Sequence, residues 1–232
     1  MRVVSLVPSI TETLLAWGVD VVACTRFCEQ PSLRHVGGTK DPDITAIVRL
    51  RPDLVVVDRE ENRREDAEAL RAAGVDVHVT HVVSIDDVPG TLAELTSAVQ
   101  ATTPAQPAAH DADLLDLRAF VPIWRRPTMS INAETYGSSL LAHVGVANVL
   151  ADERDRYPTV ELESVAARRP DLVILPSEPY PFTERHRPEY EAAFPGATVA
   201  LVDGRDLFWW GVRTPAAVRR IREALRATSR PS

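Results

Sequence analysis

A seven-residue segment that occurs twice limits the folds open to this chain more than any other feature. RPDLVVV at residues 51–57 returns as RPDLVIL at residues 169–175. Each copy follows a helical pattern, DITAIVRL at residues 43–50 and VELESVAAR at residues 160–168. A repeat of this kind indicates two related structural units.

The neighbouring patterns recur in the same order. Each copy has a strand, a helix with a double Leu and a closing Gly, the Arg-Pro-Asp strand, and a further strand that begins at a Gly. These patterns lie at residues 2–8, 11–19, 51–57 and 74–80 in the first copy, and at residues 127–132, 136–146, 169–175 and 196–203 in the second. Short apolar strands alternating with amphipathic helices predict βαβ units and parallel sheets buried on both faces. We predict an α/β fold with two similar Rossmann-like lobes. A single doubly wound sheet of about six or seven strands is the alternative.

The segment between the two copies has a different pattern. Residues 86–101 and 111–120 have helical periodicity, and TTPAQP at residues 102–107 interrupts it with two prolines that break or kink a helix. We interpret the segment as a helical connector and expect a last helix at residues 214–227. The predicted boundaries are 1–84 for the N-terminal lobe, 85–125 for the connector and 126–232 for the C-terminal lobe.

Composition excludes several classes of protein. The net charge is −7, acidic and basic residues are interspersed, and hydrophobic residues make up 45% of the chain, so we expect a globular protein that binds no nucleic acid. Two cysteines are too few for a disulfide framework or a structural zinc site. The sequence has no apolar run long enough to span a membrane. It begins directly with a strand pattern, so we expect a cytoplasmic protein as the sequence stands, or an extracytoplasmic one if an export signal was trimmed.

Unusual residues follow the strands of the first copy. Ligands of parallel sheets bind beyond the carboxyl ends of the strands, so these loops are candidate sites. Ser9 and Glu12 fit a capping box at a helix start, which is a simple cap or a source of backbone N–H groups for a ligand. The next strand is followed by an aromatic and a thiol; the thiol is either an inert buried Cys or a ligand for a soft metal. The candidate contacts in this copy are Pro8, Ser9, Phe27, Cys28, Glu60, Glu61 and Asn62.

The second copy is rich in aromatic residues at the corresponding places. PSEPYPF at residues 176–182 has three prolines that restrict the backbone, and FWW at residues 208–210 gathers three large rings in one loop. We expect one of the two adjacent tryptophans to contact a ligand and the other to lie in the core. The candidate contacts are Tyr136, Glu178, Tyr180, Phe182, Trp209, Trp210 and Arg213.

Motifs of common enzymes are absent from the sequence. It contains no GxSxG, GxxxxGK[ST], GxGxxG or HExxH, and its six histidines are scattered. The only acid/base pair that we can suggest is His81 with Glu178. We therefore predict no catalytic residues and no metal-ligating set.

Six segments together resemble the cobalamin-type periplasmic binding proteins, also called helical-backbone metal receptors. They are SLVPSITETLLAWG, TRFCEQP, VGGTKDPDITAIVRLRPDLVVV, REENRRED, PSEPYPFTERH and FWWGVRTP. The resemblance covers nearly the whole chain. It implies a class III periplasmic-binding-protein-like fold of two α/β lobes, with a ligand held between them and little hinge closure.

The resemblance also implies residue roles and partners. Trp209 matches the ligand-stacking aromatic of the second lobe, and residues 60–62 match the cleft loop of the first. A Glu on each lobe pairs with transporter arginines in such proteins, which implies Glu65 and Glu189 here. Asp58 stands where the cobalamin binder carries a Trp. The connector is shorter than usual and contains prolines.

These features predict a monomeric solute-binding protein of an ABC importer rather than an enzyme. Its ligand would be a cobalamin-like or other metal chelate, such as haem or a ferric siderophore, held in the interlobe cleft, with no intrinsic cofactor and with the transporter permease as partner. Two alternatives remain: a cytosolic corrinoid or metal-chelate carrier or sensor without a transport role, and a tetrapyrrole chelatase-like enzyme.

Overall fold

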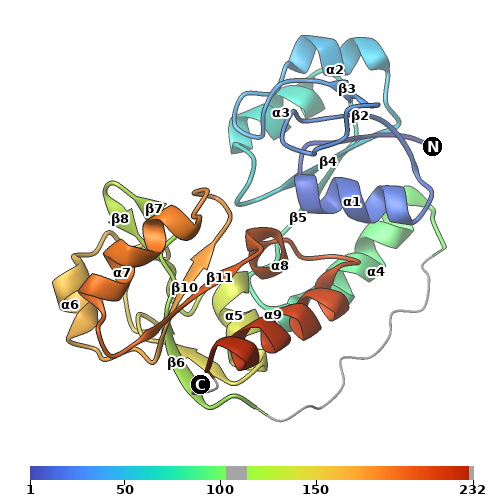
Figure 1. Cartoon of the computed structure of the whole chain (residues 1–232). Helices are drawn as coiled ribbons and strands as arrows, with labels where there is room; N and C mark the ends of the chain where they lie inside the picture. The colour runs from blue at the N-terminus through green and yellow to red at the C-terminus, as the bar shows by residue number, and fades with distance from the viewer. Residues whose placement is uncertain (103–113, 230–232) are drawn as a thin grey trace. The chain divides into compact units, whose positions relative to one another are not determined.

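A computed structural model describes residues 1–102 and 114–229 of the chain, which divides into two compact units (Figure 1). Unit 1 comprises Met1–Val82, Asp86–Gln106 and Trp210–Val212, and unit 2 comprises Val83–Ile85, Pro107–Trp209 and Arg213–Ser232, where the structure describes them. Each unit contains a parallel sheet with its own helices. The predicted α/β class with two Rossmann-like lobes is therefore confirmed.

Unit 1 is built on a five-stranded sheet with the order β3-β2-β1-β4-β5, in which all neighbouring strands are parallel. Its elements are β1 (Arg2–Ser5), α1 (Pro8–Ala16), β2 (Asp20–Cys24), β3 (Arg34–His35), α2 (Ile44–Leu50), β4 (Leu54–Asp58), α3 (Arg64–Ala72), β5 (Val77–Thr80) and α4 (Val88–Val99), which follows a short 3₁₀ turn, η1 (Ile85–Asp87). Every residue of β4 is buried, as expected for a central strand covered on both faces.

Unit 2 is built on a four-stranded parallel sheet with the order β11-β10-β6-β9 and a separate antiparallel hairpin, β7-β8. Its elements are β6 (Leu117–Phe120), β7 (Trp124–Arg125), β8 (Thr128–Met129), α5 (Tyr136–His143), β9 (Val146–Asn148), α6 (Leu162–Ala166), β10 (Leu172–Pro176), η2 (Glu184–His186), α7 (Arg187–Ala193), β11 (Thr198–Val202), α8 (Gly204–Phe208) and α9 (Thr214–Ser229). The final helix was predicted and is present as α9.

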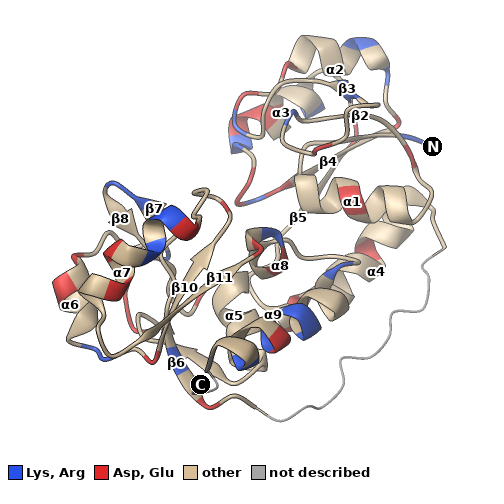
Figure 2. Cartoon of the chain, viewed as in Figure 1, with Lys and Arg blue, Asp and Glu red and all other residues tan. Residues whose placement is uncertain are grey.

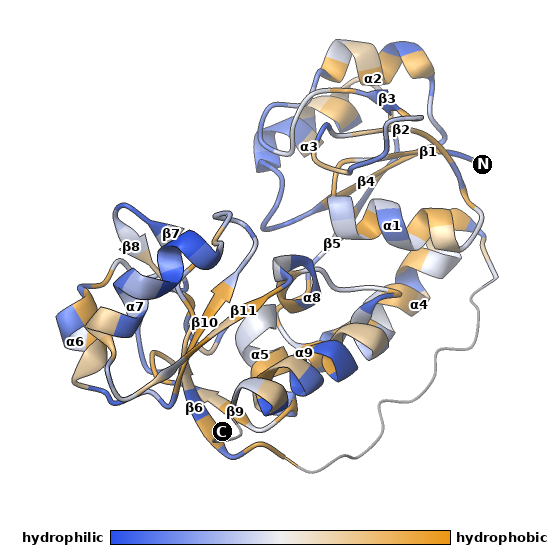
Figure 3. Cartoon of the chain, in the orientation of Figure 1, coloured by the Kyte–Doolittle hydropathy of each residue, from blue (hydrophilic) through white to orange (hydrophobic). Residues whose placement is uncertain are grey.

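The two sheets have the same strand order when their elements are matched. β2-β1-β4-β5 of unit 1 corresponds to β9-β6-β10-β11 of unit 2, and unit 1 adds β3 at its edge. Figure 3 shows the apolar colour of β10 and β11, which agrees with the continuous apolar runs typical of buried parallel strands. The repeat in the sequence thus reflects one topology that occurs twice.

The repeated Arg-Pro-Asp segment has the same structural role in both units. Arg51 caps the end of α2, and Arg169 follows the turn after α6; both are left-handed, with φ values of 47° and 51°, and the following Pro cannot continue a helix. The Asp then binds the first residues of the neighbouring strand. Asp53 accepts from the backbone N of Arg2 at 2.6 Å, and Asp171 accepts from the backbone N of Arg118 at 2.8 Å.

The arginine at the start of each central strand completes this junction. The guanidinium of Arg2 donates to the carbonyl of Leu50, and that of Arg118 donates to the carbonyls of Arg168 and Arg169. The first bond satisfies a C-terminal carbonyl of α2 that has no partner within the helix, and the other two satisfy carbonyls of the turn after α6. The equivalent of β1 in unit 2 is therefore β6.

Because β6 is the counterpart of β1, two predictions about the second copy are wrong. We expected its first strand at residues 127–132, but Thr128–Met129 form the hairpin strand β8, outside the parallel sheet. We expected a helix at residues 111–120, but Leu117–Phe120 form β6, and residues 111–113 lie outside the described part of the chain. The predicted proline interruption was at residues 102–107, of which residues 103–107 also lie outside the described part.

The segment predicted as a connector, 85–125, is divided between the units. α4 belongs to unit 1 and contacts β5, whereas β6 and β7 belong to unit 2. Among the described residues, no helix is both long and apolar enough to span a membrane.

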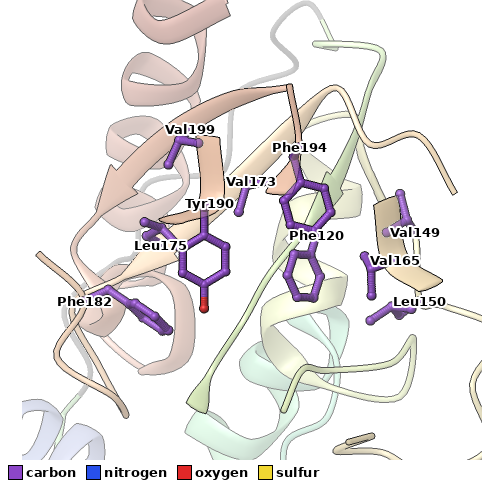
Figure 4. Close-up of a cluster of buried hydrophobic side chains, with 10 residues drawn as sticks. All are labelled: Phe120, Val149, Leu150, Val165, Val173, Leu175, Phe182, Tyr190, Phe194 and Val199. Carbon is purple, nitrogen blue, oxygen red and sulfur yellow. The ribbon is translucent and has the colours of Figure 1, made fainter. Parts of the chain in front are cut away.

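Each unit has its own hydrophobic core. In unit 1, Val4, Ile47, Val55 and Leu70 pack between the sheet and α2 and α3. In unit 2, aromatic residues take a larger part. Figure 4 shows Phe120, Phe194, Tyr190 and Phe182 together with aliphatic residues from β10 and β11. The rings of Phe120 and Phe194 have centroids 5.4 Å apart.

Candidate functional site

The carboxyl edge of the unit 1 sheet is organised around the buried carboxylate of Asp58, the last residue of β4. Oδ1 of Asp58 accepts from the backbone N of Glu60 at 2.8 Å, and Oδ2 accepts from the Thr80 hydroxyl at 2.8 Å. Burial raises the pKa of Asp58, while the Thr80 hydroxyl acts in the opposite direction. Asp58 therefore connects the ends of β4 and β5 and shapes the loop that follows.

The buried side chain of Asn62 also holds this loop by hydrogen bonds. Its Oδ1 accepts from the backbone N of Asp58 at 2.8 Å, and its Nδ2 donates to the carbonyls of Leu6 and Thr39 at 3.2 and 2.9 Å. Both amide hydrogens are thus used within the unit, and the side chain is buried. Asn62, predicted as a ligand contact, holds the loops after β1, β3 and β4 together.

Unlike Asn62, the two glutamates of this loop are not buried. The carbonyl of Glu60 accepts from Nζ of Lys40 at 2.5 Å, and Glu60 is partly exposed. Glu61 is exposed, yet desolvation by the surrounding protein and the charge of Asp58 raise its pKa, and Lys40 opposes them. Glu60 and Glu61 are therefore the carboxylates of this loop that a ligand or solvent can reach.

The loop after β2 presents an aromatic ring above a buried thiol. Phe27 is 51% exposed, and the guanidinium of Arg26 lies over its ring at 4.8 Å from the centroid. Arg26 is itself held by Asp41 at 3.0 Å. Cys28 is 3% exposed and lies beneath this surface. Phe27 and Cys28, both predicted contacts, differ completely in accessibility.

The start of α1 differs from its predicted form. The N-cap is Val7, Pro8 occupies the first turn, and no side chain caps the helix, so the predicted capping box of Ser9 and Glu12 is wrong. Pro is favoured at this position because its missing N–H has no partner within a helix, and it moves the helix start to before Ser9. Pro8 is partly exposed and Ser9 is buried.

The loops of unit 2 form an aromatic group at its sheet edge. Tyr180 follows β10, and its ring lies 4.7 Å from that of Phe182 and 5.5 Å, edge to face, from that of Trp124. Trp124 is 44% exposed and follows the end of β6, whereas Phe182 is 2% exposed and packs against Tyr190 in the core (Figure 4). Trp124 and Tyr180 are therefore the accessible rings, and Phe182 supports Tyr180 from below.

Trp124 is the residue that the sequence prediction missed. It lies four residues after β6. Placing the strand at residues 127–132 put Trp124 before a strand, where no ligand contact was expected. The sequence signal that could have located it is Arg118, which corresponds to Arg2 of β1. Matching these two arginines would have placed a strand just before Trp124.

The loop after β11 holds a third accessible ring of unit 2, beside a cation. The guanidinium of Arg213 lies 5.2 Å from the centroid of the Trp209 ring, and it donates to the buried carboxylate of Asp206 at 2.8 Å. Arg220 also donates to Asp206, at 2.5 Å. This network fixes Arg213 against Trp209, which is partly exposed.

Two further predicted aromatic contacts lie inside the protein. Trp210 is 5% exposed and belongs to unit 1, where the adjacent Gly211 packs against Thr13 of α1. The expectation that one of the two adjacent tryptophans is buried matches this arrangement. Tyr136 is buried as well; its hydroxyl lies 3.0 Å from that of Thr214, and burial raises its pKa to about 12.

The charged residues predicted for partner contacts lie on helices. Figure 2 shows acidic and basic residues side by side along α3. The Glu65 side chain on α3 is 70% exposed, whereas Glu189 on α7 is 39% exposed and accepts from Arg125 at 2.5 and 3.0 Å. Glu65 is thus far more available to a partner than Glu189.

The acid/base pair considered for an enzyme is divided between the units, with His81 in unit 1 and Glu178 in unit 2. Glu178 is partly exposed, and its backbone packs against Gly204, where a Cβ atom would clash. His81 borders a shallow acidic depression with Asp86, Asp87 and Glu94. Within residues 1–102 and 114–229, no group of three or more His, Cys, Asp or Glu side chains could hold a metal ion.

The structure therefore defines a class: an α/β protein of two units whose parallel sheets share a four-strand order, with aromatic and charged loops at the carboxyl edges of the sheets. A family model described as "Periplasmic binding protein" matches residues 3–186. The chain belongs to this family of binding proteins.

Relatives and solved structures agree with this assignment. The chain is 25% identical to the vitamin B12-binding protein of Pectobacterium carotovorum over 198 residues, covering 77% of this chain and 72% of that protein. It is 27% identical to the vitamin B12-binding protein of Yersinia pestis over 192 residues, covering 75% and 69%.

Among solved structures, the fold is similar to the haem-binding protein BhuT in complex with two haems, with a TM-score of 0.80, 20% identity and 99% of each chain covered. It is also similar to the vitamin B12-binding protein BtuF of Vibrio cholerae, with a TM-score of 0.75, 19% identity, and 99% of this chain and 98% of that chain covered.

Proposed function

We propose that this protein is the solute-binding component of an ABC importer and that it binds a metal chelate of the cobalamin, haem or ferric siderophore type without transforming it. The observation that carries the proposal is the set of accessible rings at the strand-end loops, Phe27 in unit 1 and Trp124, Tyr180 and Trp209 in unit 2. Membership of the binding-protein family supports it, as do relatives named for vitamin B12 and a structural neighbour that holds two haems.

The chemistry of these loops fits a large, flat and partly charged ligand. Rings at loop positions offer stacking surfaces, and each 100 Å² of apolar ligand surface that they cover contributes roughly 2.5 kcal/mol. Arg26 and Arg213 lie beside two of the rings, so a ligand with carboxylate or phosphate groups would gain charge-assisted hydrogen bonds. Haem carboxylates and the phosphate of cobalamin both provide such groups.

Tryptophan fluorescence offers a direct test because Trp124 and Trp209 lie among the proposed contacts. We expect saturable quenching with at least one of cobalamin, haem and a ferric siderophore, each titrated separately. Free N-acetyltryptophanamide at the same absorbance corrects for light absorbed by the ligand. Absence of saturable quenching with every chelate would remove the chelate-binding proposal.

The importer role requires a separate test. Glu65 is the docking residue that we propose, since its side chain is exposed at the start of α3, while Glu189 is held by Arg125. We expect the loaded protein to stimulate ATP hydrolysis by its importer in proteoliposomes, and Glu65→Lys to reduce this stimulation without changing chelate affinity. Equal stimulation by both proteins would leave Glu65 without a docking role, and no stimulation by either would favour a carrier or sensor.

A further inference from the structure

The two cysteines of the chain lie together at the carboxyl end of β2. Cys24 is the last residue of the strand, and the next four residues form a turn in which the backbone N of Cys28 donates to the carbonyl of Thr25 at 3.1 Å. The turn leaves the two thiols close enough for a side-chain hydrogen bond between them. Cys24 is 0% exposed, Cys28 is 3% exposed, and both are free thiols.

The surroundings of Cys28 are polar, unlike those of a thiol packed only for its volume. Its Sγ lies 3.2 Å from the hydroxyl of Thr11 and 3.2 Å from that of Thr25. A hydrogen bond from the Cys24 thiol lowers the pKa of Cys28 to about 6, aided by the two hydroxyls and opposed by desolvation, while the pKa of Cys24 is raised. The lowered pKa of Cys28 favours its thiolate, which is the nucleophilic form of cysteine, and the raised pKa of Cys24 favours its thiol.

Cys28 lies in a short turn and contacts Thr11 of α1, whereas Cys24 is the last residue of strand β2. Its neighbours Phe27 and Glu29 are both exposed, and Glu29 has a left-handed φ of 52°. A local opening of residues 26–29 would expose the Cys28 sulfur and leave the strand pairing of β2 in place. Such local openings cost less free energy than unfolding of the whole unit.

We propose that Cys24 and Cys28 form a redox-active pair that closes to an intramolecular disulfide by exchange with a small-molecule or protein disulfide. The Cys28 thiolate attacks one sulfur of the incoming disulfide and forms a mixed disulfide, and the other sulfur leaves as a thiolate. Cys24 then loses its proton to that thiolate or to solvent and attacks Sγ of Cys28. The second half of the incoming disulfide leaves, so that two protein thiols are oxidised and one disulfide is reduced to two thiols.

The new bond would tie the turn that carries Phe27 to the end of β2. The disulfide would then fix the turn next to the exposed ring of Phe27, in place of the contacts between the thiols and the neighbouring hydroxyls. This inference concerns the chemistry of the thiols alone and does not depend on the ligand proposed above.

The test is thiol trapping of the folded full-length chain. The reduced protein is incubated with oxidised glutathione, quenched with acid, denatured and treated with N-ethylmaleimide, and its intact mass is measured. We expect wild type to lose the mass of two hydrogen atoms and to take up no maleimide, while the untreated control takes up two, one for each cysteine. Two maleimides after oxidation, a persistent glutathione adduct, or a disulfide-linked dimer would each overturn the proposal.

Single substitutions assign the two roles and serve as matched controls. In Cys24→Ser the attacking thiol remains without its partner, so we expect a stable glutathione adduct on Cys28. In Cys28→Ser only the deeper thiol remains, and we expect it to stay unmodified over the same time. Equal modification of the two variants would contradict the assigned order. Far-UV circular dichroism checks that both variants are folded, and the wild-type result stands without them.

Discussion

The carboxyl edges of the two sheets share a topology but differ in chemistry. In unit 1, buried polar groups join the strand ends: Asp58 binds Thr80 and the backbone of Glu60, and Asn62 binds three backbone groups. In unit 2, aromatic rings follow the strand ends: Trp124 packs against Tyr180, and the guanidinium of Arg213 lies over Trp209. The difference teaches that a duplicated framework fixes where the loops leave the sheet, while the side chains of those loops differ between the two copies.

Asn62→Ala tests the structural role of the unit 1 edge and has the largest expected effect. It removes both amide bonds to carbonyls and leaves the backbone N of Asp58 without its acceptor, so we expect a loss of about 3 kcal/mol in the free energy of unfolding. Urea denaturation measures it. Arg59→Ala, at an exposed position of the same loop, is the control and should change stability by less than about 0.5 kcal/mol. Equal midpoints for the two variants would show that the amide network contributes little.

Trp209→Ala tests the contact role of the unit 2 edge. We expect the dissociation constant of the bound chelate to rise about 30-fold, which corresponds to about 2 kcal/mol of lost ring contact. The melting temperature should change little, because Asp206 still holds Arg213. Trp209→Phe retains a ring and should recover most of the affinity. An unchanged affinity in Trp209→Ala would place the ligand away from this loop.

Trp124→Ala examines the ring that follows β6. Trp124 is 44% exposed and its ring also packs against Tyr180, so we expect about a tenfold loss of affinity. Isothermal titration of wild type and variant measures the change. Arg126→Ala, an exposed change in the same hairpin, is the control and should bind as wild type does. If both variants bind as wild type does, the aromatic group is confined to Trp209 and Tyr180.

His186 gives unit 2 a smaller, pH-dependent effect. Its Nδ1 accepts from the backbone N of Thr183 at 3.0 Å, and its ring lies 5.6 Å from those of Tyr180 and Phe182. Desolvation and the nearby charges of Arg185 and Arg125 lower its pKa. A histidine whose pKa is depressed by folding contributes stability that is present above its unfolded pKa, about 6.5, and is lost as the pH falls through the folded value.

Urea denaturation as a function of pH measures this contribution. We expect wild type to lose stability as the pH falls below about 6.5, and His186→Gln, which retains an acceptor for Thr183 without a titrating group, to lose less. Parallel pH profiles for the two proteins would rule out His186 as a source of the acid sensitivity.

The framework was predictable from the sequence because it rests on local backbone rules. The Arg-Pro-Asp repeat lies between a helix and a buried strand in both units, and its positive φ and its Asp–backbone bonds follow from that role. β6 was not predicted because four residues carry little periodicity and the preceding DADLLDL has a helical pattern. Because β6 was not predicted, Trp124 was not recognised as a residue of a strand-end loop.

The side chains of the candidate site were harder to predict because exposure depends on packing between elements distant in sequence. Phe182 and Tyr180 occur in the same proline-rich loop, yet one lies in the core and the other at its surface. Asn62 resembles a ligand contact until its three backbone partners are known. Asp58, at the end of β4, is buried and accepts a hydrogen bond from Thr80.

The central claim is that the rings of the unit 2 edge hold a metal chelate. Isothermal titration of wild type and of the double variant Trp124→Ala/Trp209→Ala with cobalamin, haem and a ferric siderophore tests it most directly. The account predicts saturable binding of at least one chelate by wild type and a loss of at least about 100-fold in affinity in the folded double variant. Binding of equal strength by both proteins, or by neither, would contradict it.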